Sequence, residues 1–330
     1  MVKPAQCKIG LATLFVIIFG FIPNSDVVQS RGHGAQTGLS DLLDRASKRV
    51  EEYKNLFKDL TAEETKTTEV FNRRGEVTEK KVALSDFFVY QSRFNDQAMY
   101  EYRPARSINA KSVTNREENV QKFFNKLARA DTGEKESEIL FEENRKGHLR
   151  YWYFHLTLNP AGAFYKQSQG YYDFEITGRE EIEGRETVVV GYALKDARPL
   201  NPRELIGKRM SSDFKSGILR FRGRYWLDAE NARMLRHENE DTLEFNDTKD
   251  PLVAIRRLYE YASSGYGITV PKRIVVDLFL DSWREKDGAR RLSRDCRITY
   301  EYGPFQRFGV TSKEEEKKTI TGKEKPLQHD

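Results

Sequence analysis

Residue types that could do chemistry gather in the stretch RYWLDAENARMLRHE, which runs from Arg224 to Glu238. They are two carboxylates, an amide and an imidazole: Asp228, Glu230, Asn231 and His237. A zinc or calcium site needs several ligands that converge on one point, and the D-x-D-x-D-G spacing of a calcium loop is missing here. Asp and Asn are common in turns, because their short side chains bond nearby backbone groups. We therefore interpret residues 228–233 as a turn between two strands and predict no metal site.

The histidines form no recognisable catalytic arrangement. His237 stands beside Glu238, but a His–Glu pair needs a third group to act as a catalytic site. The other histidines beyond residue 30 have neither HxH nor HExxH spacing; they are His33, His148, His155 and His329. His155 lies in the apolar stretch YWYFHLTL, and we interpret it as a core or edge histidine.

Motifs of the common enzyme classes are also missing from the sequence. It contains no G-x-S-x-G, no Walker loop and no G-x-G-x-x-G. The stretch SSGYG, Ser263 to Gly267, lies between two predicted strands, whereas a nucleophile elbow joins a strand to a helix. We therefore predict that the protein is not an enzyme and uses no cofactor, with an exported hydrolase as the remaining enzymatic hypothesis.

The strand before the 228–233 turn has two different faces. Phe221, Gly223, Tyr225 and Leu227 share one of them. Arg220, Arg222, Arg224 and Trp226 share the other. An arginine and aromatic face could bind anionic headgroups or nucleic acid, or it could be the solvated outer face of a sheet. We favour the solvated face and expect no nucleic-acid partner, because the formal net charge of +5 is a mild excess without a basic cluster.

The first 30 residues have the layout of a secretory signal peptide. Lys3 and Lys8 precede an uncharged run from Ile9 to Ile22, and Pro23 ends it. The run is shorter than the roughly 20 apolar residues that span a bilayer. Cleavage is expected after Ser30 or near Ala35, and an uncleaved anchor is the alternative. We predict a periplasmic protein.

The cysteines exclude two possibilities. Cys7 precedes the apolar run, whereas a lipoprotein carries its cysteine after it, so the protein is not expected to be a lipoprotein. Once residues 1–30 are removed, only Cys296 remains, and one cysteine cannot form an internal disulfide. Cys296 shares the parity of Ile298 and Tyr300, so we interpret it as a small buried side chain rather than a nucleophile.

Two helices are predicted from apolar residues at three- and four-residue steps. The first covers Ser40 to Leu60, with Ser40 as a candidate N-cap. The second covers 114–130, where Thr114 and Glu117 fit a capping box. Residues 131–138 are interpreted as a linker, and a strand or short helix is expected around Leu140.

The remainder reads as alternating segments joined by short turns, which predicts β-hairpins. The fold class is α+β: a curved, mostly antiparallel sheet of roughly ten strands, a half-barrel, with helices covering its concave face. The predicted domain organisation is a signal peptide at 1–30, a flexible segment at 31–38, one β-rich domain at 39–310 and a disordered charged tail at 311–330.

Large apolar side chains line one face of several predicted strands. A sheet with this lining either packs against helices or closes around an apolar pocket, and a packed core is the alternative to a cavity. The residues expected to line a hydrophobic cavity are Tyr172, Phe174, Ile176, Tyr225, Leu227, Ile274, Val276, Leu278, Tyr300 and Tyr302.

Three stretches of the chain resemble the LolA/LolB-like group of outer-membrane lipoprotein-sorting proteins. They are FEITGREEIEGRETVVVGYAL (Phe174 to Leu194), GRYWLDAENARMLRHE (Gly223 to Glu238), and YGITVPKRIVVDLF followed by ITYEYGPFQRFGV. The resemblance implies a half-barrel around an apolar cavity closed by helices, a periplasmic location, bound acyl chains of lipids or lipoproteins, and no catalytic residues. The expected function is a non-enzymatic lipid or lipoprotein carrier. The alternative is an envelope sensor or interaction module whose partner is an envelope membrane protein.

Overall fold

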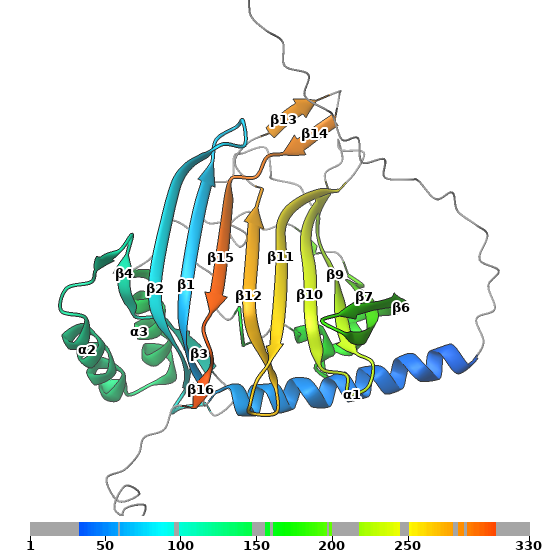
Figure 1. The fold of residues 1–330 in the computed structure, drawn as a ribbon, viewed down its shortest axis with the longest axis horizontal. Coiled ribbons are helices and arrows are strands. Elements are labelled where there is room, and N and C mark those ends of the chain that lie inside the picture. Colours follow the sequence, from blue (N-terminus) through cyan, green and yellow to red (C-terminus); the bar gives the residue numbers. More distant parts are fainter. Residues whose placement is uncertain are drawn as a thin grey trace, which may run out of the picture.

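The computed structural model describes residues 33–58, 60–95, 99–146, 156–158, 161–196, 198–199, 218–244, 251–279, 283–286 and 289–307. The signal-peptide and tail predictions, and His148, His155 and His329, lie outside these residues. Within them the fold is α+β, as predicted: one curved antiparallel sheet accompanied by helices (Figure 1). None of the described helices combines the length and apolar content needed to cross a membrane.

Fourteen strands form the main sheet, more than the ten expected because several short strands extend it. In spatial order, eleven of them are β5 (Lys111–Ser112), β4 (Ala105–Ile108), β2 (Val77–Gln91), β1 (Leu60–Phe71), β15 (Cys296–Tyr302), β12 (Thr269–Leu278), β11 (Leu252–Ser263), β10 (Met234–Glu244), β9 (Ile218–Asp228), β7 (Arg185–Leu194) and β6 (Tyr172–Ile182). Beside this path, β3 (Met99–Tyr102) pairs with β2, β16 (Gln306–Arg307) with β1, and β8 (Arg198–Pro199) with β9. A separate hairpin consists of β13 (Trp283–Lys286) and β14 (Ala289–Leu292).

The last long strand holds the sheet together. β15 lies between β1 and β12 and pairs antiparallel with both. It therefore joins the N-terminal strands β1 to β5 to the hairpins of the second half, β6 to β12. Without β15 the chain would form two smaller sheets, so the sheet is complete only when the C-terminal strand has paired.

Three α-helices and two 3₁₀ turns accompany the sheet in the described residues. They are α1 (His33–Phe57), α2 (Arg116–Arg129), α3 (Gly133–Lys146), η1 (Gly162–Phe164) and η2 (Gln169–Tyr171). α1 begins before Ser40, at His33, inside the segment expected to be flexible. α2 begins at Arg116, and the preceding residue, Asn115, has a left-handed φ of 55° and makes no side-chain cap bond. The capping box predicted for Thr114 and Glu117 was therefore wrong. α3 occupies most of the predicted linker.

The helices lie on both sides of the sheet. We call the side that α1 contacts the inner face: Phe57 of α1 packs there against Phe87 of β2. The next residue, Phe88, points the other way, because successive side chains of a strand alternate. It belongs to a cluster with Phe123 and Leu127 of α2. α1 thus covers the concave side as predicted, whereas α2 and α3 pack against the outer face of β2 and β3.

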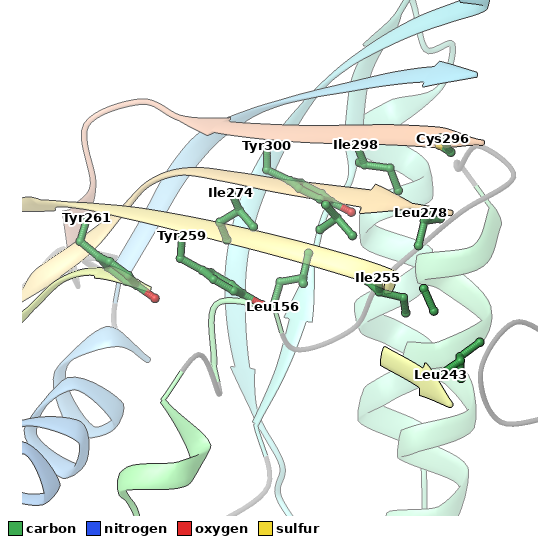
Figure 2. Close-up of a cluster of buried hydrophobic side chains, with 12 residues drawn as sticks. Leu156, Leu243, Ile255, Tyr259, Tyr261, Ile274, Leu278, Cys296, Ile298 and Tyr300 are labelled. Atoms are coloured by element: carbon green, nitrogen blue, oxygen red, sulfur yellow. The ribbon is translucent and has the colours of Figure 1, made fainter. Parts of the chain in front are cut away.

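The inner face carries the apolar core. One cluster is centred on β11, β12 and β15, and Figure 2 shows its side chains pointing to the same side of the sheet. A second joins α1 and η1 to β7 and β9, and a third joins the C-terminal end of α1 to β1 and β2. Cys296 is fully buried in the first cluster, in agreement with its interpretation as a core residue.

Candidate functional site

The polar residues of 228–233 serve the backbone of a turn. The Asp228 carboxylate accepts hydrogen bonds from the N–H groups of Glu230 and Asn231, both at 3.0 Å. The Asn231 side-chain oxygen accepts one from the Arg233 N–H at 3.0 Å, and Ala232 has a left-handed φ of 58°. These groups are oriented toward backbone rather than toward a common point. No cluster of His, Cys, Asp or Glu in the described part of the chain could hold a metal ion.

The same turn receives α1. Arg45 of α1 donates to the carbonyl oxygen of Glu230 at 3.1 Å, and Arg49 donates to that of Asn231 at 2.9 Å. Arg49 also bonds Glu52 on the same helix at 2.6 Å. The stretch that resembled an acid–base site is therefore a docking point for the helix that covers the inner face.

His237 is buried on the inner face between two tyrosine rings. It stacks on Tyr225 at 4.1 Å and on Tyr259 at 5.1 Å, and its Nε2 pairs with the Tyr192 hydroxyl at 2.8 Å. Burial, with the positive charge of Arg257 adding to it, lowers the pKa of His237 well below its ordinary value. The ring is therefore neutral near pH 7, and a neutral ring whose Nε2 is engaged by tyrosine is a packing element.

A glycine makes room for the Tyr192–His237 contact. A Cβ placed on Gly223 would lie 2.3 Å from the carbonyl oxygen of Glu238 and 2.6 Å from the Tyr192 hydroxyl. Contacts this short are not tolerated, so only glycine allows the tyrosine ring to lie across β9 at this point. The alternation noted from the sequence, with Gly223 on the face of Tyr225, thus has a steric reason.

A single cross-strand row runs over the inner face. Directly opposed residues on eight neighbouring strands form it, and each pair is in register. In spatial order they are Val190, Tyr225, His237, Tyr259, Ile274, Tyr300, Lys66 and Ala83. Figure 2 shows three members, Tyr259, Ile274 and Tyr300, projecting from adjacent strands. The row is aromatic and apolar at one end and becomes cationic at β1.

The cationic end belongs to a buried ionic cluster. Arg103 lies between two carboxylates, with Nε 2.7 Å from Glu64 and Nη2 2.7 Å from Glu101. Glu101 also accepts hydrogen bonds from Thr157, at 2.6 Å from its N–H and 2.5 Å from its hydroxyl. Burial raises the pKa of Glu101, but Arg103 and Thr157 override it, so the pKa is lowered and the group stays ionised.

Lys66 is the second cation of this cluster. Its amine lies 5.3 Å from the centre of the Tyr300 ring. Burial lowers the pKa of Lys66 to about 8, opposed by the charge of Glu64. Sequence reasoning missed the cluster. One signal was present: Glu64, Lys66 and Thr68 share the strand parity of Ala62, but a polar set at that parity does not by itself indicate an inner face.

The predicted cavity-lining residues all belong to the strand parities of the inner face, but they do not form one site. Tyr172, Phe174, Tyr225 and Leu227 join the cluster beneath α1 and η1. Ile274, Val276, Leu278 and Tyr300 join the central cluster, with Tyr302 against it. Ile176 is 46% exposed. It lies on the edge strand β6, where the pairing with β7 is irregular between Ile176 and Gly178, so no neighbouring strand or helix covers it.

A small apolar cavity lies between α1 and the inner face. Its walls include Val50 and Tyr53 of α1, Leu158, Phe164 and Leu227, and its volume is about 40 Å³. That volume accommodates about one water molecule, whereas small-molecule pockets usually measure about 300–1,000 Å³. An acyl chain therefore fits only after α1 moves.

The arginines of β9 lie on the outer face, in ladders with acidic residues of β10. Arg220 pairs with Glu244 at 2.6 Å and Arg224 with Glu238 at 2.9 Å. These cations are about half exposed and are neutralised across the strands. This agrees with the solvated outer face predicted from the sequence.

Comparison with known proteins finds neither a matching family model nor a matching curated protein. Several solved structures are similar, including the following three. A DUF1329 family protein from Desulfovibrio piger shares 13% identity at a TM-score of 0.33, over 83% of this chain and 94% of that one. A putative outer membrane lipoprotein-sorting protein domain from Vibrio parahaemolyticus shares 10% at 0.34, over 85% and 98%. A LolA superfamily protein from Nitrosomonas europaea shares 10% at 0.30, over 83% and 95%.

Two of these matches carry names of the lipoprotein-sorting group that the sequence motifs resemble. At such identities and TM-scores they carry no argument about ligand, partner or activity. A proposal of function therefore rests on the residues of this chain.

Proposed function

We propose that the protein is a non-enzymatic periplasmic carrier that binds an acyl chain between α1 and the inner face of the sheet. The observation that supports it is the apolar cavity beneath α1, walled by helix, loop and sheet residues. The cavity is small because α1 rests directly on the sheet. The proposal requires α1 up to Val50 to lift while its last turn, around Phe57, stays in place.

The packing of α1 differs along its length in the way this movement needs. At its C-terminal end Phe57 is fully buried and stacks with Tyr53 at 4.7 Å and against Phe305 at 5.4 Å. Between Gly38 and Val50, Leu42 and Ala46 are the buried apolar residues of α1. The aromatic end can thus act as the hinge and the preceding part of the helix as the lid.

The free energies of burial favour the displacement of α1 from the sheet by a long acyl chain. Exposing Leu42, with Ala46 and three partly buried neighbours, costs on the order of 6 kcal/mol at the usual burial energies per side chain. The contacts of Arg45 and Arg49 with the turn add about 1 kcal/mol each, or less. An acyl chain with fourteen buried methylenes contributes about 11 kcal/mol at about 0.8 kcal/mol per methylene. A long chain can therefore displace the lid, and a short one cannot.

The test combines co-purified lipid with a designed probe. Mass spectrometry of protein isolated from its native envelope should detect bound acyl species. Purified protein should bind cis-parinaric acid, a fluorescent fatty acid of eighteen carbons, and Val50→Asp should weaken that binding at least tenfold, because the carboxylate enters the cavity wall. Lys48→Asp is the matched control on the exposed side of α1 and should leave binding unchanged. The carrier hypothesis is refuted if no acyl species co-purifies and the wild-type protein does not bind the probe.

A second function follows from the close packing of the interior. The ionic cluster and the stacked row fill much of the inner face with side chains that already have partners. A sheet filled in this way can serve as a rigid scaffold for an envelope sensor or interaction module. Absence of bound lipid, with an unchanged affinity for a protein partner in Val50→Asp, would favour this function.

A further inference from the structure

A second concave surface lies on the opposite side of the sheet, beneath α2. It is a groove of about 630 Å³ between α2 and the β3–β5 region. Its floor is apolar and consists of Tyr102, Ile108, Val113, Val120 and Phe123. Figure 1 places α2 at one end of the sheet, beside β2 and β4. No residue that lines the groove also lines the proposed acyl cavity, so the two sites are separate.

The rim of the groove is basic. Lys122, Lys126 and Arg129 of α2 line it, and their spacing of four and three residues puts them on one helix face. All three are exposed. Glu143 is the one acidic residue of the lining. An occupant with negative charge matches such a surface.

Ion pairs inside the protein do not account for this basic rim. Arg103 and Arg116 also line the groove, but they are engaged with Glu64, Glu101 and Asp86. Lys122 has Glu118 as an exposed partner one turn away. Among the described residues, no ion pair involves Lys126 or Arg129.

Helix capping does not account for it either. Cations near a helix C-terminus often stabilise the last carbonyl groups. In α2 that role belongs to Arg93, whose guanidinium donates to the carbonyl oxygens of Leu127, Ala128 and Ala130 at 2.5, 3.3 and 3.1 Å. Lys126 and Arg129 are thus left to face the groove.

We propose that the α2 groove binds an acidic peptide segment of a partner protein, with apolar side chains of the segment on the floor and its carboxylates on Lys122, Lys126 and Arg129. A volume of this size suits a few residues of an extended or helical segment. A flat anionic bilayer matches the charge but not the shape, because it cannot reach a recessed apolar floor. The groove is therefore assigned to a peptide and not to a membrane surface.

The test uses full-length mature protein and a fluorescein-labelled peptide that alternates Glu and Leu. Anisotropy should show binding that weakens as salt rises, and a peptide with Lys in place of Glu should not bind. Lys126→Glu/Arg129→Glu should weaken binding at least tenfold. Arg73→Glu/Arg74→Glu reverses the same charge in the exposed β1–β2 turn and should change binding less than twofold.

The apolar floor is tested by Val120→Ser, which should weaken binding while leaving the salt dependence intact. Equal affinity of wild type and the Lys126→Glu/Arg129→Glu variant would overturn the proposal. Absence of peptide binding together with α2-dependent binding to phosphatidylglycerol vesicles would also overturn it and assign the rim to lipid. Because the groove and the acyl site share no residue, loss of cis-parinaric acid binding leaves this result unaffected.

Discussion

Arg103 is a buried cation whose removal should strongly destabilise the fold. It is 8% exposed and bonds Glu64 and Glu101 at 2.7 Å each. Its guanidinium also lies 5.1 Å from the Phe87 ring and 5.7 Å from the Tyr300 ring. Arg103→Met keeps the hydrophobic stem and deletes the charge. Two carboxylates would then remain buried without their common partner.

The magnitude follows from the cost of an unpaired buried charge. Breaking a buried ion pair by removing one partner typically costs about 3–5 kcal/mol. Lys66 also interacts with Glu64, so part of that negative charge stays balanced. We expect the low end of the range, about 3 kcal/mol, out of a total stability of about 5–15 kcal/mol.

The free energy of unfolding should change with pH in opposite directions in the wild type and in Arg103→Met. In the wild type the pKa of Glu101 is lowered, since Arg103 and Thr157 outweigh burial, so its contribution is present at neutral pH and is lost as the pH falls. In Arg103→Met burial dominates, and the pKa of Glu101 should rise above its ordinary value. The folded variant then takes up a proton, and its free energy of unfolding should increase from pH 7 to pH 5.

The assay is urea denaturation followed by tryptophan fluorescence at pH 7 and pH 5. Trp226 is buried and reports unfolding. Arg220→Met is the control, because it breaks an exposed pair with Glu244 and should cost at most about 1 kcal/mol. If Arg103→Met loses no more than this control, or becomes less stable at pH 5 than at pH 7, the reasoning is refuted.

Three further predictions concern the same sheet. Gly223→Ala should destabilise by several kcal/mol in urea, because its Cβ would meet the Glu238 carbonyl at 2.3 Å, while Gly178→Ala meets nothing within 4 Å and should be nearly neutral. Lys66→Met should abolish a rise in stability between pH 8 and 9.5. Burial lowers the pKa of Lys66 to about 8, so above that pH the wild-type folded state binds fewer protons than the unfolded chain. The free energy of unfolding of the wild type, measured in urea at each pH, should therefore rise by up to about 1.4 kcal/mol per pH unit. Asp228→Ala should lower the thermal midpoint by the equivalent of about 1–2 kcal/mol, since two backbone N–H groups lose their acceptor; an unchanged midpoint would contradict its role in the turn.

The hairpins could be predicted because their information is local. Alternation of apolar and polar residues places Tyr225 and Leu227 on the face opposite Arg224, and the structure keeps that arrangement. The turn between β6 and β7 is equally local, since Glu183 and Gly184 both have a positive φ. Such features depend on residues a few positions apart.

A neighbour overrode the local pattern at two positions, and at one of them the prediction was wrong. Ile176 has the parity of Tyr172 and Phe174, yet it is exposed because β6 is an edge strand with an irregular register there. The capping box of Thr114 did not form because Asn115 adopts a left-handed conformation ahead of α2. Both outcomes depend on what lies beside the segment.

The sequence by itself determined the alternation of the strand 218–228, the turn chemistry of 228–233 and the burial of Cys296, because strand alternation and side-chain capping act over short distances. Only the tertiary structure decided that β15 pairs between β1 and β12, which brings Lys66 under Tyr300. It alone also decided that Glu64, Glu101 and Arg103 share one buried cluster. The physical reason is that a buried charge is tolerated only beside its partner, and here Glu64 of β1 lies 39 residues before its partner Arg103.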